Sequence, residues 1–137
     1  MSNIKPLSIL QKRAVRIIYK ADSREHTNRL LLKSGLLKLK EIAELQTLLV
    51  MHKVKSRMLP VYVQQLFVFG SDKEDHRRTF NFKHPYARTT LKQMCISVVG
   101  VKLWNSQQKE LKNCICIFQL KKLYKLRKMG LYEAECE

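Results

Sequence analysis

The chain has 137 residues, 45% of them hydrophobic, which is enough for one domain with an apolar core but not comfortably for two. This composition excludes wholesale disorder, and no apolar run approaches the roughly 18 residues that a transmembrane helix needs. The 27 basic and 11 acidic side chains give a net charge of +16, which draws polyanions. Nucleic acid is therefore the partner we expect. An anionic membrane surface ranks second on charge alone, and we predict no membrane partner.

The N-terminal sequence lacks the apolar core and cleavage site of a secretory signal. We therefore expect an intracellular protein, nuclear or cytoplasmic and not secreted, with reduced thiols. The four cysteines do not form a metal-ligand set, because Cys114 and Cys116 make a C-x-C pair and no histidine follows His84. Phosphate-cradling loops, nucleophile motifs and well-framed pairs of carboxylates are also missing from the sequence. We predict no metal site, no cofactor and no enzymatic activity on this chain.

Residues 6–21 are predicted to form an amphipathic helix that starts at Pro6. Its apolar stripe consists of Leu7, Leu10, Ala14, Ile17, Ile18 and Ala21. Another face aligns Lys12, Arg16 and Lys20 at four-residue spacing, and the helix contains no acid. Because like charges four residues apart repel each other, this pattern favours phosphate as the target of the face over an ordinary solvated surface.

Three further helices are predicted before residue 70. Residues 27–34 form a short helix that Gly35 ends, and residues 38–57 have the strongest amphipathic pattern of the chain. Acids near the start and bases near the end of this longer helix complement its dipole, so these charges need no functional explanation. Residues 61–69 are apolar and aromatic, and we favour a short helix started by Pro60 over an extended segment.

The stretch from His76 to Lys102 contains cations and aromatic rings but no carboxylate. Its candidates for phosphate contact are Arg77, Arg78, Lys83, Arg88 and Lys92. Phe82 and Tyr86 are flat rings that can stack on nucleic-acid bases. The competing interpretation is a basic connection that leads into a helix anchored by a buried tryptophan, and composition alone does not separate the two.

The last part of the chain combines short β signals with helices. Residues 80–83 alternate in polarity and residues 95–99 are rich in β-branched side chains, so each is predicted as a short strand. A helix over residues 101–112 contains Trp104, the only tryptophan, which we assign to the core. A basic amphipathic helix covers residues 115–128, and we expect the acidic end that follows it to be loose.

These elements predict a mainly α fold: a small helical domain of about five helices with a short β element between residues 80 and 100. We divide the chain into an amphipathic helical part, a basic and aromatic loop, a Trp-anchored C-terminal helical part and an acidic tail. In that order, these parts cover residues 1–69, 70–92, 93–130 and 131–137.

Four segments recur together in a known protein family. They are LQKRAVRIIYKA (10–21), LLKLKEIAELQTLLVMHKVKSRMLPVYVQQLF (36–67), RTTLKQMCISVVGVKLWNS (88–106) and FQLKKLYKLRK (118–128). In this order they resemble the C-terminal, thumb-adjacent region of the reverse transcriptases of non-LTR, LINE-type retrotransposons. One departure is Gln107-Gln108, where the family has Leu-Pro. The paired-aspartate palm of the family would lie upstream of Met1, so no catalytic role transfers to a residue of this chain.

The resemblance implies a non-catalytic, basic helical region that helps to hold template RNA or target DNA beside an upstream polymerase core. With the charge pattern, it predicts contacts to RNA or DNA phosphates without sequence specificity. Two alternatives remain, namely a helical module that docks onto a protein and a transposon-derived remnant with no selected function. The sequence does not decide between RNA and DNA, nor does it indicate an oligomeric state.

Overall fold

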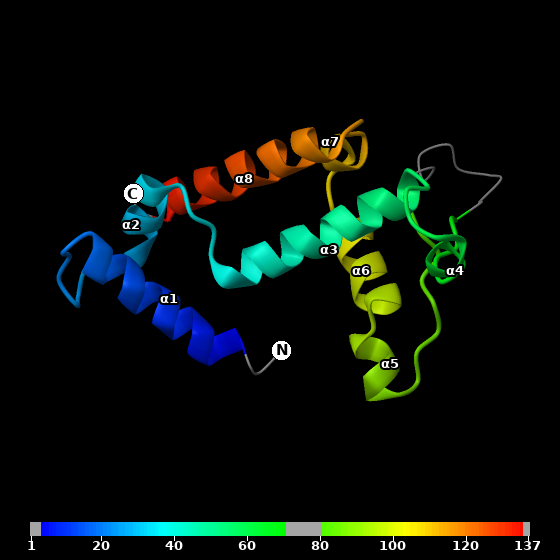
Figure 1. Ribbon diagram of the computed structural model, residues 1–137, viewed down its shortest axis with the longest axis horizontal. Helices are drawn as coiled ribbons and strands as arrows, with labels where there is room; N and C mark the ends of the chain where they lie inside the picture. Colours follow the sequence, from blue (N-terminus) through cyan, green and yellow to red (C-terminus); the bar gives the residue numbers. More distant parts are fainter. Residues whose placement is uncertain (1–3, 71–80, 136–137) are drawn as a thin grey trace. The chain divides into compact units, whose positions relative to one another are not determined.

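The computed structural model describes residues 4–70 and 81–135, which are mainly helical (Figure 1). The helices are α1 (Ile4–Ile18), α2 (Thr27–Ser34), α3 (Leu39–Lys55), α4 (Val61–Gln64), α5 (Thr90–Met94), α6 (Ile96–Asn105), α7 (Lys109–Lys112) and α8 (Ile117–Ala134). The β structure within these residues is one antiparallel bridge, between Phe69 and Phe82. The predicted helical fold class is therefore confirmed, with more and shorter helices than expected.

The chain divides into two compact units. The terminal unit comprises residues 1–45 and 121–137, and the central unit comprises residues 46–120. Helices α3 and α8 each contribute residues to both units. This division differs from the four successive parts predicted from the sequence, because the first and last portions of the chain belong to one unit.

The core of the terminal unit is small and apolar. Val15 of α1, Leu30 and Leu31 of α2, and Tyr132 of α8 form one buried cluster. Burial of each aliphatic side chain stabilises the fold by about 1.5–3 kcal/mol. The two consecutive leucines are therefore the main apolar contribution of α2, the helix whose bounds the sequence predicted correctly.

Helix α1 packs through a face that is not the centre of its apolar stripe. Its buried residue is Val15, and the Gln11 amide one turn earlier donates to the Leu37 carbonyl over 2.9 Å and accepts from the Leu39 N–H over 3.0 Å. Most of the predicted stripe is exposed, namely Leu7, Leu10, Ile17 and Ile18. Within the described residues, the neighbouring elements therefore cover only one edge of the apolar arc, and the stripe identified from the sequence is mostly exposed.

Three helices end in the same left-handed turn. At Gly35 (φ 63°), the N–H groups of Gly35 and the next residue return to carbonyls of the last turn of α2, which satisfies the helix end. Lys20 (φ 49°) and Arg57 (φ 54°) occupy the equivalent position after α1 and α3, with the same pair of backbone hydrogen bonds. Glycine is the usual residue at this position, so both cations sit on a strained backbone.

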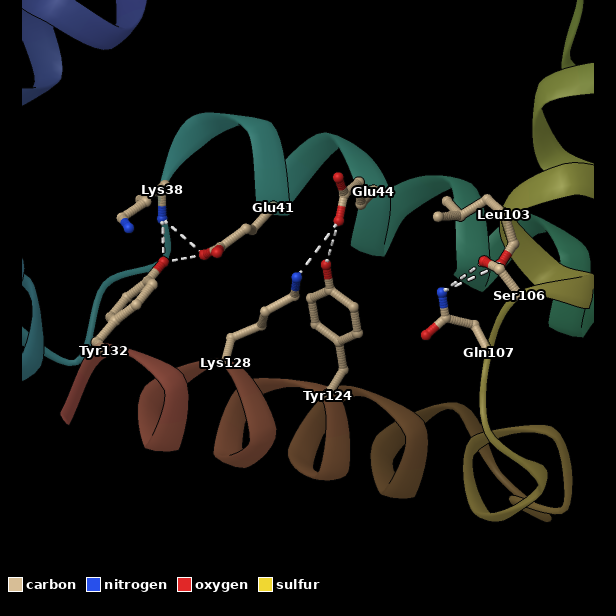
Figure 2. A network of polar contacts seen from close by, with 9 residues as sticks. All are labelled: Lys38, Glu41, Glu44, Leu103, Ser106, Gln107, Tyr124, Lys128 and Tyr132. Carbon is tan, nitrogen blue, oxygen red and sulfur yellow. Dashed lines mark hydrogen bonds and ion pairs between the residues drawn. The ribbon is translucent and has the colours of Figure 1, made fainter. Parts of the chain in front are cut away.

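Polar side chains of α8 reach α3 within the terminal unit (Figure 2). The Tyr124 hydroxyl donates to Glu44 Oε2 over 3.0 Å, and Lys128 Nζ lies 3.6 Å from the same oxygen. The pKa of the Tyr124 hydroxyl is raised, first by burial and then by the Glu44 carboxylate. The phenol therefore remains a hydrogen-bond donor throughout the physiological pH range.

The end of α8 contradicts the predicted loose tail. Tyr132 is buried, donates to the Glu41 carboxylate and accepts from the Lys38 N–H over 3.0 Å (Figure 2). Glu135 then makes a 3.3 Å ion pair with Lys38 Nζ and accepts a hydrogen bond from Asn28. Glu135, which looked like part of a solvated tail, is instead a partner of Asn28 in α2 and of Lys38 just before α3.

Helix α6 supplies the core of the central unit. Val98, Val101 and Trp104 recur every three residues and are all buried, which confirms the assignment of the tryptophan to the core. A Cβ added to Gly100 would lie 2.8 Å from Met51 Sδ of α3, so the glycine permits this close approach. The β-branched run predicted as a strand is the first turn of this helix, which corrects that expectation.

Candidate nucleic-acid interface

Phe82 anchors the basic and aromatic stretch to the central unit. Its ring centroid lies 4.6 Å from that of Phe69, 6.0 Å from that of Phe67 and 6.0 Å from that of Trp104. Only 2% of Phe82 is exposed. It is therefore not available to stack on a base, and the prediction that it contacts nucleic acid was wrong.

The backbone of Phe82 is held by a side chain that sequence reasoning overlooked. The Asn105 amide donates to the Phe82 carbonyl over 2.8 Å, and the Phe82 N–H donates to Asn105 Oδ1 over 3.0 Å. On its other side, the bridge to Phe69 is closed by the Lys83 N–H, which donates to the Val68 carbonyl over 2.7 Å. Residue 82 is therefore fixed through both its ring and its backbone.

A buried lysine also holds the chain next to Phe82 in place. Lys112 Nζ donates to Asn81 Oδ1 over 2.9 Å and to the Asn105 carbonyl over 2.8 Å, and burial lowers the pKa of this ammonium group. Lys55 of α3 donates in turn to the Lys112 carbonyl. These roles could not be predicted from the sequence, because an isolated lysine in a basic chain looks like any other surface cation.

Beyond this anchor the chain emerges into solvent. The Tyr86 ring is 82% exposed, between exposed Lys83 and Arg88. The intervening His84 is also exposed, and its Nδ1 lies 3.1 Å from the Pro85 carbonyl. The structure thus presents an aromatic ring with a cation on each side of it in the sequence.

The far end of this segment is the short helix α5, which the sequence analysis missed. The Thr89 side chain caps it by accepting from the Lys92 N–H over 3.4 Å, and the Gln93 amide donates to the Ala87 carbonyl over 3.2 Å. The Lys92 side chain is exposed, as are the apolar side chains of Leu91 and Met94. The Thr-Thr pair before an apolar residue was the sequence signal that could have found this helix.

Of the five predicted cations in this stretch, the structure describes three. Lys83, Arg88 and Lys92 are exposed, and none of them has an acidic partner among the described residues. Arg77 and Arg78 lie outside the described residues. No carboxylate occurs between residues 81 and 109, so no acidic side chain offsets these cations within that part of the sequence. We call residues 83–92 the Tyr86 segment.

The second predicted set of cations belongs to α1 in the terminal unit. Lys12 and Lys20 are exposed and make no ion pair within the part of the chain that the structure describes. Arg16 is half-buried, and its Nη2 and Nε donate to the Glu25 carbonyl over 3.2 and 3.4 Å. Arg16 therefore holds the turn after α1, whereas Lys12 and Lys20 remain free to meet an anion.

Residues 4–70 and 81–135 show neither a metal-binding group of side chains nor a membrane-spanning helix. Within them, no three His, Cys, Asp or Glu side chains are grouped so that they could bind a metal ion. In the same residues, no helix is both long enough and apolar enough to cross a membrane. Comparison with protein-family models, curated proteins and solved structures gave no match. The resemblance to LINE-type reverse transcriptases therefore stays a prediction.

Proposed function

We propose that this chain binds nucleic acid without sequence specificity, through exposed cations that contact phosphates. The observation that carries the proposal is the Tyr86 segment, in which the cations are exposed to solvent and no carboxylate occurs between residues 81 and 109. The aromatic cluster around Phe82 holds the start of this segment in place. Ordinary solvated surfaces mix both signs of charge, and this one does not. Phosphate contact gives affinity without reading sequence, because every nucleotide carries the same group.

On this proposal the chain is a binding region and not a catalyst. Its resemblance to the thumb-adjacent region of LINE-type reverse transcriptases suggests a matching role, in which it holds RNA or DNA beside a polymerase core. The exposed Lys12 and Lys20 of α1 supply a second basic surface in the terminal unit. Arg77 and Arg78, which lie outside the described residues, precede the Tyr86 segment in the sequence and remain candidates for phosphate contact.

The proposal is tested by titrating salt against oligonucleotide binding. Each neutralised phosphate releases condensed counterions, so about five contacts give a slope of log K against log salt near −4 to −5 on duplex DNA. We expect binding in the micromolar range or tighter at low salt that weakens along such a slope. A flat salt response, or no binding at low salt, contradicts the proposal.

A charge-reversal pair localises the binding. The triple variant Lys83→Glu, Arg88→Glu and Lys92→Glu changes the net charge by −6. The control triple Lys33→Glu, Lys40→Glu and Lys53→Glu makes the same change at exposed lysines elsewhere. We expect the first to abolish binding and the second to weaken it only slightly. Equal losses would mean that net charge alone attracts the ligand and that the Tyr86 segment is not the site.

A second candidate function is supported by the exposed apolar arc of α1. Ile17 is 77% exposed and Ile18 is 70% exposed, and Leu10, about two helical turns earlier, is exposed as well. Contiguous exposed apolar surface of this kind often marks a site of protein interaction. A helical module that docks onto a protein, such as an upstream polymerase core, would bury this arc. The double variant Ile17→Gln and Ile18→Gln should then abolish capture of that protein and leave oligonucleotide binding unchanged.

A further inference from the structure

We infer that the Tyr86 segment selects single-stranded over duplex nucleic acid by stacking an unpaired base on the Tyr86 ring. The inference rests on the proposed function, because it names the substrate class of the same surface. It goes further by assigning the ring a role that phosphate contact does not require.

Two aromatic rings four residues apart, those of Phe82 and Tyr86, differ sharply in exposure. Phe82 is buried in the aromatic cluster, whereas Tyr86 is 82% exposed and its hydroxyl has no hydrogen-bond partner among the described residues. A large ring that is exposed to water is not packed into the core, and both of its faces remain accessible. Such a face is the surface on which a base of any identity can stack.

The Tyr86 ring lies on a segment that is held at both ends. Phe82 fixes one end of the segment through its ring and its backbone, and the bond from Gln93 to the Ala87 carbonyl fixes the other. Pro85 restricts the backbone immediately before Tyr86. Because both flanks are held, less conformational freedom is lost when a base binds.

The Tyr86 segment is better suited to bind a single strand than a duplex. A base within a duplex is already stacked on its neighbours, so a side-chain ring can meet its face only where the base is unpaired. Helix α5, with five residues, is the only regular element of the Tyr86 segment, so the segment offers no long helix or pair of strands to enter a major groove. Lys83, Arg88 and Lys92 can instead follow the phosphates of a flexible strand.

Another exposed tyrosine shows that exposure alone does not make such a site. Tyr62 of α4 is 72% exposed in the same central unit, yet no cation occurs between residues 58 and 70. Tyr62 thus lacks the flanking cations in the sequence that would hold a phosphate beside its ring. Tyr62 therefore provides a matched control for the loss of an exposed tyrosine ring.

The test compares one fluorescein-labelled strand of about 15 nucleotides, a length that spans typical single-strand sites, with the same strand annealed to its complement. Affinities for the full chain are measured at one fixed salt concentration. The variants are Tyr86→Ala, Tyr86→Leu, Tyr86→Phe and Tyr62→Ala, each checked for an unchanged thermal unfolding curve. Tyr86→Leu keeps an apolar side chain without a ring, and Tyr86→Phe keeps the ring.

We expect the wild-type chain to bind the single strand more tightly than the duplex. Tyr86→Ala and Tyr86→Leu should weaken single-strand binding about 5- to 150-fold, the range measured for loss of one stacked base, and should change duplex binding less than about 2-fold. Tyr86→Phe and Tyr62→Ala should leave both affinities unchanged.

The failures of the two proposals can be told apart. If the single strand and the duplex bind equally well, or if the ring-removing variants bind the single strand as the wild type does, the single-strand inference is overturned while phosphate binding stands. If neither oligonucleotide binds at low salt, the proposed function itself fails and the inference fails with it.

Discussion

The burial of single residues next to the Tyr86 segment could be predicted from the sequence only in part. The alternating polarity of residues 80–83 indicated one buried face and one exposed face, but not which ring would find an aromatic cluster. Phe82 did so because Phe67, Phe69 and Trp104 surround it. The position of Trp104 could be predicted, because a large ring on an amphipathic helix gains most from burial.

The first prediction concerns Asn105, whose amide satisfies both backbone groups of Phe82. Asn105→Ala leaves a buried N–H and a buried carbonyl without partners. We expect the free energy of unfolding to fall by about 1–3 kcal/mol, measured by chemical denaturation. Gln108→Ala is the control, because this exposed amide makes no side-chain capping bond and should change stability by less than about 0.5 kcal/mol.

The second prediction concerns Glu41, whose pKa is raised mainly by burial. The folded state therefore holds the proton of Glu41 more tightly than the unfolded state does. It follows that the contribution of Glu41 to stability is largest in acid and is lost as pH rises through the folded-state pKa. Glu41→Gln keeps an acceptor for the Tyr132 hydroxyl and the Lys38 N–H, but it does not titrate.

The measurement for Glu41 is the difference in unfolding free energy between the wild type and Glu41→Gln, followed from pH 7 to pH 4. We expect the wild type to gain stability relative to the variant as the pH falls, because only the wild type takes up this proton. The difference removes the titration of all other groups common to both proteins. A wild type that loses stability relative to the variant on acidification would contradict the burial argument.

At the scale of elements, helices with clear amphipathic patterns or clear start and end signals were predictable, including the short helix after Pro60, whereas the short helix α5 was not. The range 27–34 agrees with α2 because Gly35 marks its end. Residues 95–99 have β-branched side chains, but the three-residue spacing of buried positions along α6 decided for helix. The last turns of α8 were missed because Glu133 and Glu135 masked the burial of Tyr132.

The third prediction uses the left-handed turns at helix ends. Lys20→Gly should exceed Lys20→Ala in stability by about 0.5–1 kcal/mol. Both variants remove the charge, but alanine keeps a strain of about 1–2 kcal/mol, which the greater unfolded-state freedom of glycine partly offsets. Gly35→Ala should destabilise the folded protein by a similar amount, because alanine is strained at this positive φ. Steric overlap adds nothing, since the new Cβ would meet only Lys125 Nζ, at an ordinary contact distance of 3.6 Å. Thermal denaturation of the three variants measures these differences. Equal stability of the two Lys20 variants would show that the turn carries no strain.

At the scale of the whole molecule, the excess of positive charge was evident from composition, but its distribution was not. Glu41, Glu44 and Glu135 are all engaged in the terminal unit, where they accept hydrogen bonds from α8 and its neighbours. The sequence had suggested an ordinary dipole effect for the first two and a solvated tail for the third. Long-range pairing of this kind is invisible to a local pattern.

The burial of the single tryptophan gives the central unit an optical label of its own. Trp104 is 1% exposed, and the other buried rings of large absorbance, Tyr124 and Tyr132, belong to the terminal unit. Fluorescence excited at wavelengths that only indole absorbs therefore reports the unfolding of the aromatic cluster that anchors the Tyr86 segment. A shift of that emission to longer wavelengths before the tyrosine circular dichroism bands disappear would identify the central unit as the first part of the chain to unfold.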